Sequence, residues 1–126
     1  MRDLKFRAWN KENKKMYIPE CIVDGKAGEV IYGEIISISS EDTVMQYTGL
    51  KDMNGVGVFQ GDILNLYNVF KTPMRMGVVK YDIARASNVI YYKESNCGFD
   101  INAFEHIEVV GNIFENPDMM NEAHTN

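Results

Sequence analysis

The stretch that decides the fold of this 126-residue chain is MQYTGLKDMNGVGVFQGDI, which runs from Met45 to Ile63. It places two turn signals between runs of β-forming residues. Asn54-Gly55 is the strongest short signal for a β-hairpin, because both residues tolerate a positive φ angle. Gly61-Asp62 marks a second tight turn. The stretch therefore predicts three short strands joined by tight turns, with Asn54-Gly55 at a hairpin tip.

The pattern of β-forming runs separated by turn residues continues on the C-terminal side of this stretch. Residues 63–67, 77–81, 89–92 and 107–114 are rich in Val, Ile, Tyr and Phe, which favour strands. Short strands at intervals of about ten residues, separated by Gly turns, are typical of small barrels and sandwiches. Asn116-Pro117 then predicts the start of a short helix, with Asn as the N-cap and Pro at the first helical position.

On the N-terminal side, Phe6 and Ala8 alternate with polar residues, which predicts a half-buried strand. A polar turn over residues 10–15 and a second strand from Met16 complete a hairpin. Trp9 faces away from Phe6 and Ala8 in this pattern. It therefore either packs inside the fold or belongs to an interface.

Further β-forming runs over residues 29–32 and 34–38 are interrupted by Gly33. No segment sustains the 3.6-residue period of a long helix. We therefore predict a mainly β protein with minor α structure, an SH3-like small barrel with an N-terminal β-hairpin extension. The expected organisation is an N-terminal β-hairpin region over 1–43, an SH3-like barrel region over 44–115, and a short C-terminal helix or tail over 116–126.

The composition is typical of a globular protein that folds without disulfide bonds or bound metal ions. Hydrophobic residues make up 45% of the chain and charged residues 25%, which is ordinary for a domain of this size. Two cysteines, Cys21 and Cys97, are too few for a disulfide scaffold and predict reduced thiols. No apolar run approaches the roughly 20 residues that span a bilayer, and no signal-peptide core is present. We expect a cytoplasmic protein that does not bind membranes.

The charge is distributed unevenly. Residues 1–18 carry six basic and two acidic residues, a net +4, whereas the whole chain has −5, so the remainder carries −9. A basic hairpin could contact nucleic acid, the acidic part of its own chain or a neighbouring subunit, or it could simply be solvated. Because affinity for nucleic acid comes largely from neutralised phosphates, the acidic pI of about 5.0 argues against that partner.

No motif for catalysis or cofactor binding is visible. The thiols and imidazoles, Cys21, Cys97, His106 and His124, form no CxxC or HxxxH pair of the kind that binds zinc. No phosphate-binding glycine motif occurs. Asp52, Asn54 and Asp62 suggest oxygen ligands for an ion, but turns explain Asn54 and Asp62 equally well. We expect no cofactor, no metal and no enzymatic activity.

Three blocks of the chain carry a family resemblance. They are KFRAWNKENKKMY (Lys5–Tyr17), MQYTGLKDMNGVGVFQGDI (Met45–Ile63) and IEVVGNIFENPDM (Ile107–Met119). Together they resemble the YopX family of phage and prophage proteins, whose biochemical role is unassigned. Gln60 departs from the family pattern, which usually has a charged residue before Gly-Asp, and residues 20–41 match little. The resemblance implies a small β-rich phage or prophage protein made in a bacterial host cell, and it supplies no catalytic residues.

Some residues of these blocks are candidates for an interaction surface. Trp9 lies between basic residues and could anchor a partner. The full candidate set is Arg7, Trp9, Lys11, Tyr47, Lys51 and Asp62. The alternative is that the polar members only hydrogen-bond the turns.

Two functions remain open. The favoured one is a non-enzymatic protein-interaction module that binds an unidentified phage or host protein, or forms a dimer or higher homo-oligomer. The other is a weak nucleic-acid-binding β-barrel protein that uses the basic hairpin and Trp9.

Overall fold

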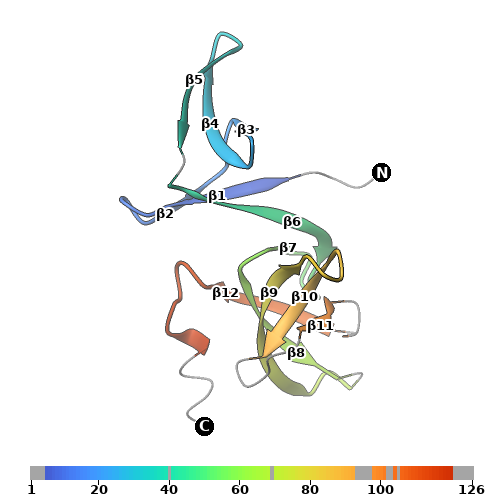
Figure 1. Cartoon of the computed structure of the whole chain (residues 1–126). Coiled ribbons are helices and arrows are strands. Elements are labelled where there is room, and N and C mark those ends of the chain that lie inside the picture. Colours follow the sequence, from blue (N-terminus) through green and yellow to red (C-terminus); the bar gives the residue numbers. More distant parts are fainter. Residues whose placement is uncertain are drawn as a thin grey trace. The chain divides into compact units, whose positions relative to one another are not determined.

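The computed structural model describes residues 5–39, 41–68, 70–92, 98–101, 104 and 106–120, without the side chain of Ile36. These residues form twelve β-strands, and α-helical conformation among them is limited to Met119–Met120 (Figure 1). All strand pairs with a defined register are antiparallel. The predicted mainly β fold is confirmed.

The chain divides into two compact units between Tyr47 and Thr48. The boundary falls within one strand, β6. In the first unit, one sheet has the order β2-β1-β6 and the other the order β3-β4-β5. The strands are β1 (Phe6–Asn10), β2 (Lys15–Tyr17), β3 (Cys21–Val23), β4 (Lys26–Ile31), β5 (Glu34–Ser39) and β6 (Thr43–Lys51).

The predicted N-terminal hairpin is formed by β1 and β2, which meet with Asn10 opposite Lys15. The Asn10 side chain shapes the turn, because its Oδ1 accepts hydrogen bonds from the backbone N–H of Glu12 and Asn13. Both faces of β1 are covered, since Ala8 is fully buried and Trp9 is only 8% exposed. Trp9 is therefore a packing residue and presents no open ring to a base.

Two tight turns build the β3-β4-β5 sheet. Asp24-Gly25 joins Val23 to Lys26, and Tyr32-Gly33 joins Ile31 to Glu34. In both turns the two central residues have positive φ, which matches the right-handed twist of the flanking strands. Asp-Gly is a common pair for this geometry, whereas Tyr32 at φ +52° is an unusual one.

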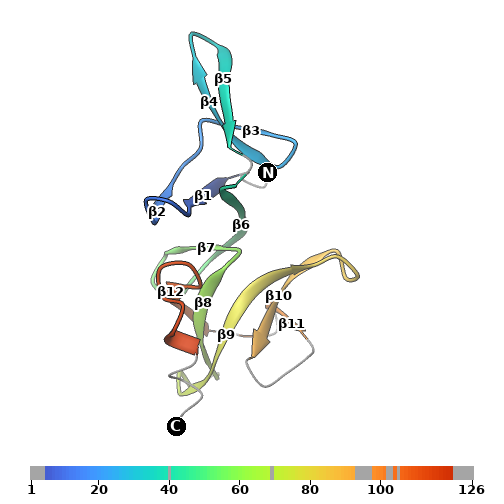
Figure 2. The same cartoon turned by 60° about the vertical axis from the view of Figure 1, so that its left-hand side comes forward.

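The second unit contains a five-stranded antiparallel sheet that curls into a half-barrel (Figure 2). Its strand order is β11-β10-β9-β8-β12. A further strand, β7, is hydrogen-bonded to β6. The strands are β7 (Gly57–Phe59), β8 (Asp62–Tyr67), β9 (Pro73–Asp82), β10 (Ser87–Tyr92), β11 (Gly98–Asp100) and β12 (His106–Asn112).

The core of the second unit lies within the curl of this sheet. Alternate residues of a strand point to the same face, so Leu64 and Leu66 of β8 enter the core together. Val79 and Ile90 face each other across β9 and β10. The buried cluster comprises Val58, Leu64, Leu66, Val79, Ile90, Ile101 and Ile107.

Candidate functional site

The turn between β6 and β7 is organised by the buried side chain of Asp52. Asn54-Gly55 lies at this hairpin tip, as predicted, but only Gly55 has positive φ, at +82°. The loop is therefore longer than a two-residue turn, and Gly55 N–H donates to the carbonyl of Asp52. Asp52 Oδ1 accepts hydrogen bonds from the N–H groups of Asn54 and Val56, each at 2.8 Å. The sequence pattern located the tip but missed the residue that shapes it.

The same carboxylate connects the central block to the C-terminal block. Asp52 Oδ2 accepts a hydrogen bond of 2.9 Å from the N–H of Val109. Burial alone would raise the pKa of Asp52, but the backbone donors of Val109, Val56 and Asn54 outweigh it and hold the pKa below its usual value. Three backbone N–H groups donate to this carboxylate, so Asp52 stabilises the turn and its contact with Val109. This role explains the presence of Asp52 without the ion ligation that the sequence suggested.

Other polar residues of the central block also bond to its turns. The Thr48 hydroxyl donates to the carbonyl of Val58 at 2.7 Å and accepts from the N–H of Leu50. Asp62 is 1% exposed, and its Oδ2 accepts from the N–H of Phe59 at 2.8 Å. Asp62 is consequently a buried turn residue and not part of a surface.

The C-terminal block is held in the same way. Asn112 Oδ1 accepts from the N–H groups of Phe114 and Glu115. Asn116 Oδ1 accepts from the N–H of Asn112, so this side chain binds the end of β12 instead of capping the helix as expected. A Cβ at Gly111 would lie 2.6 Å from Asn116 Oδ1, which explains the glycine there. The matching blocks thus form a set of mutually bonded turns.

The six candidate residues do not form one surface. Only Lys11 and Lys51 are exposed, and they belong to different units. Arg7 is half-buried, and Trp9, Tyr47 and Asp62 are buried. Tyr47 belongs to the packing of the first unit, where Lys5 Nζ lies 5.3 Å from the centre of its ring.

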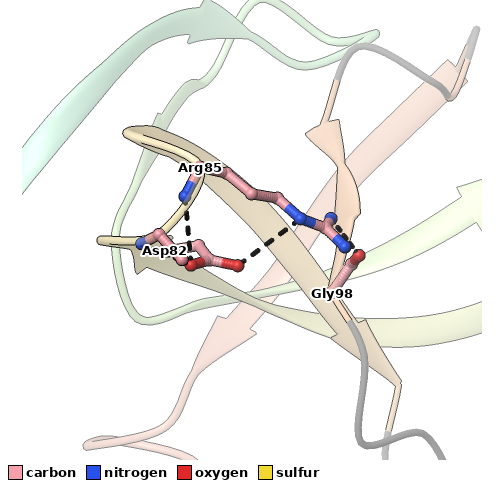
Figure 3. A network of polar contacts seen from close by, with 4 residues as sticks. Asp82, Arg85 and Gly98 are labelled. Atoms are coloured by element: carbon pink, nitrogen blue, oxygen red, sulfur yellow. Dashed lines mark hydrogen bonds and ion pairs between the residues drawn. The ribbon is translucent and has the colours of Figure 1, made fainter.

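A polar network closes the β9–β10 hairpin of the second unit (Figure 3). Asp82 Oδ1 accepts from the N–H of Ala84, and Arg85 Nε lies 3.6 Å from Asp82 Oδ2. The guanidinium of Arg85 also donates through Nη1 to the carbonyl of Gly98, as Figure 3 shows. The network ties the hairpin loop to β11, and its groups are engaged with one another.

Within the part of the chain that is described, no three His, Cys, Asp or Glu residues lie together as a metal site. Cys21 has a free, half-buried thiol, while Cys97 and His124 lie outside the described residues. Across the same described residues, no helix has the length and apolar character needed to cross a membrane.

One exposed apolar surface stands out in the first unit. We call Ile31, Tyr32, Ile35 and Ile38 the apolar hairpin; they are 51%, 101%, 53% and 47% exposed. They lie on β4, β5 and the turn between them, and β5 is an edge strand in the order β3-β4-β5. The β-forming runs of this hairpin were predictable, but their exposure was not, because such apolar runs ordinarily become core.

The first unit also contains a polar hollow of about 480 Å³. At its centre the Tyr17 hydroxyl donates a hydrogen bond to Asp42 Oδ2. Burial, then the hydrogen bond and charge of Asp42 and the charge of Glu29, raise the pKa of Tyr17 to about 12. The lining residues are Asn10, Asn13, Lys15, Met16, Tyr17, Ala27, Gly28, Glu29, Ser37, Ser39 and Asp42.

No local pattern in the sequence indicates this polar hollow, because its walls come from separate strands and turns. Ala27 and Gly28 lie side by side on β4, and a Cβ at Gly28 would approach Cys21 Sγ to 2.7 Å and the carbonyl of Ser37 to 3.2 Å.

The architecture defines a small, mainly β protein in which a curled half-barrel follows a β-hairpin unit. The profile of the YopX protein family matches residues 5–121, and the chain belongs to this family. It is also similar to the crystal structure of protein EF1440 from Enterococcus faecalis, with 27% identity and a TM-score of 0.64. That similarity covers 95% of this chain and 99% of the other. A search of curated proteins finds no match.

Proposed function

We propose that this protein is a non-enzymatic protein-interaction module of a phage or prophage, acting in the cytoplasm of the bacterial host cell. The observation that carries the proposal is the apolar hairpin. Four large apolar side chains are exposed within residues 31–38. Ile35 and Ile38 pair with Val30 and Gly28 and therefore share one face of the sheet, whereas Ile31 lies on the other face. Clustered exposed apolar side chains mark interaction sites in soluble proteins.

The edge position of β5 adds hydrogen-bonding capacity to this surface. An edge strand presents unpaired backbone N–H and C=O groups, on which another strand can pair. Natural edges are commonly protected by lysine or proline, and β5, with the sequence EIISIS, contains neither. Strand addition at β5 would satisfy these groups and bury apolar side chains at once, at about 25 cal/mol per Å² of apolar area.

The partner that fits best is a second copy of the chain. Antiparallel pairing of two β5 strands about a twofold axis is self-complementary. Glu34 is the only charged residue of β5 and lies at one end of it. In such a pair the two Glu34 side chains lie at opposite ends, so like charges do not meet.

Sedimentation velocity at tens of micromolar protein tests this proposal. We expect a dimer for the wild type and a monomer for Ile35→Lys/Ile38→Lys, because lysine places charge on the pairing strand. The matched control is Phe70→Lys/Ile83→Lys, which changes two exposed apolar residues of the second unit, 84% and 87% exposed. A monomeric wild type, or equal effects of the two double variants, would contradict the proposal. Circular dichroism confirms that each variant folds.

A further inference from the structure

The lining of the polar hollow in the first unit includes several hydrogen-bond acceptors and the small residues Ala27 and Gly28. Tyr17 and Asp42 are joined by a hydrogen bond, and Glu29 lies near enough for its charge to act on the Tyr17 hydroxyl. A carboxylate offers about four acceptor sites, so Asp42 keeps capacity after it accepts from Tyr17. The hollow therefore holds two carboxylates, two serine hydroxyls and two asparagine side chains within about 480 Å³.

The asparagines are already used by the protein. Asn10 Oδ1 accepts from two backbone N–H groups, and Asn13 Oδ1 accepts from the N–H of Lys15. Their hydrogen bonds within the β1–β2 turn hold both side chains in place at the edge of the polar hollow. The groups left for an incoming ligand are the carboxylates of Glu29 and Asp42 and the hydroxyls of Ser37 and Ser39. The groups available to a ligand in the polar hollow are therefore mainly hydrogen-bond acceptors, and two of them carry negative charge.

We propose that the polar hollow binds a guanidinium group carried on an alkyl chain. A guanidinium is planar, keeps its charge at all accessible pH values and offers five N–H donors, which suits two carboxylates approached together. Met16 and Ala27 in the lining offer apolar surface for the alkyl chain. The group can come from an arginine side chain of a polypeptide or from a free small guanidine. This site does not rest on the proposed self-association.

Among the described residues of the lining Lys15 is the one cation, and it allows a test in which binding should change in the opposite direction. Its ammonium group competes with a bound guanidinium for the carboxylates and repels it. Removing that charge should strengthen binding, whereas removing a carboxylate should weaken it. A cavity that merely accommodates any small solute would not respond in this way.

The experiment is a ¹⁵N NMR titration of the full chain with two probes, N-acetyl-argininamide and agmatine, at low salt. We expect saturable shifts at the backbone amides of Glu29, Ser37 and Asp42. Glu29→Gln and Asp42→Asn should each weaken binding about fivefold, and Lys15→Gln should strengthen it by a similar factor. The probe that binds more tightly identifies the source, a polypeptide side chain or a free guanidine.

Two matched variants serve as controls. Glu34→Gln removes a carboxylate from β5 outside the lining, and Lys14→Gln removes the neighbouring ammonium outside it; both should leave binding unchanged. Glu29 is exposed, so its variant keeps the test valid even if Asp42→Asn weakens the fold. Non-saturable shifts, equal losses in the Glu34 variant, or tighter binding of inorganic phosphate would each overturn the proposal.

Discussion

At the scale of single residues, Asp52 shows how a polar side chain can hold two distant parts of a chain together. Its carboxylate accepts N–H groups from its own turn and from Val109. No local pattern indicates such a bond, because the two residues are 57 positions apart. The Asn54-Gly55 signal is local, and it correctly predicted the hairpin tip. The sequence alone did not decide whether Asp52 is a turn residue or an ion ligand.

Replacing Asp52 with Asn should lower the free energy of unfolding by about 1–3 kcal/mol at pH 7, because an amide N–H₂ cannot accept from the buried N–H of Val109. The folded-state pKa of Asp52 is lowered, so its carboxylate stabilises the fold above the unfolded-state pKa. The difference in the free energy of unfolding between the wild type and Asp52→Asn should therefore decrease as the pH falls through the folded-state pKa of Asp52. Urea unfolding at pH 7 and at about pH 3 measures both effects.

The matched control for this prediction is Asp24→Asn, at an exposed turn position with φ +50° that asparagine also tolerates. It should change stability by only a few tenths of a kcal/mol. A loss for Asp52→Asn that stayed the same at both pH values would show that the carboxylate charge is not involved.

Tyr17 should titrate near pH 12 in the wild type and closer to its ordinary value in Asp42→Asn, because the variant removes the charge that opposes phenolate formation. The raised pKa means that this hydrogen bond stabilises the fold below about pH 10 and that the contribution is lost as the pH rises toward 12. Ultraviolet difference titration, with Tyr17→Phe to assign the signal, measures the pKa. An unchanged Tyr17 pKa in the variant would contradict the proposed electrostatic link.

At the scale of elements, the turns decide which strands pair. The β1–β2 hairpin was predictable because its turn residues lie between β-forming runs. Around Gly33 the sequence indicated two β-forming runs, and the structure pairs them as β4 and β5. Which side chains of a strand become buried was less predictable. Residues 29–38 resemble core strands in composition, yet the structure leaves Ile35 and Ile38 exposed, since burial depends on neighbours that are distant in sequence.

The turn residue Tyr32 should carry a conformational cost. Its φ of +52° is unfavourable for a bulky side chain, and asparagine tolerates that region better. Tyr32→Asn should raise the free energy of unfolding by about 0.5–1 kcal/mol in thermal or urea melts. The same change should weaken self-association, because it removes a fully exposed aromatic ring from the apolar hairpin. Tyr32→Phe keeps both the ring and the strain and should alter neither property.

At the scale of the whole molecule, charge and burial together restrict what the protein can bind. The first 18 residues are basic and the rest is acidic, but the aromatic residue that would help the basic segment hold nucleic acid, Trp9, is buried. Composition predicted the asymmetry directly. The burial of Trp9 could not be decided from alternation alone, because both faces of β1 are covered.

Nucleic-acid binding should therefore be weak and independent of sequence. Lys11, Lys14 and Lys15 are exposed in the β1–β2 turn and strand end, and they can supply only a few phosphate contacts. Fluorescence anisotropy with a labelled DNA duplex should show most affinity lost between low salt and about 200 mM salt. Changing these three lysines to serine should remove what remains, whereas Lys71→Ser and Lys80→Ser should have little effect. Tight binding that persists at 200 mM salt would favour the nucleic-acid function instead.

The bonds that join the turns of the central and C-terminal family-like blocks have a consequence for how partner choice can change over time. Those blocks supply strands and turns of the frame, and the first of the three family-like blocks also contributes Lys15 and Tyr17 to the polar hollow. The apolar hairpin and the floor of the polar hollow come instead from residues 20–39, within the part of the chain that resembles the family pattern least. Exchanging this segment between family members should transfer the binding preference of the apolar hairpin onto an unchanged frame, so that recognition could diversify within the family without a change of architecture.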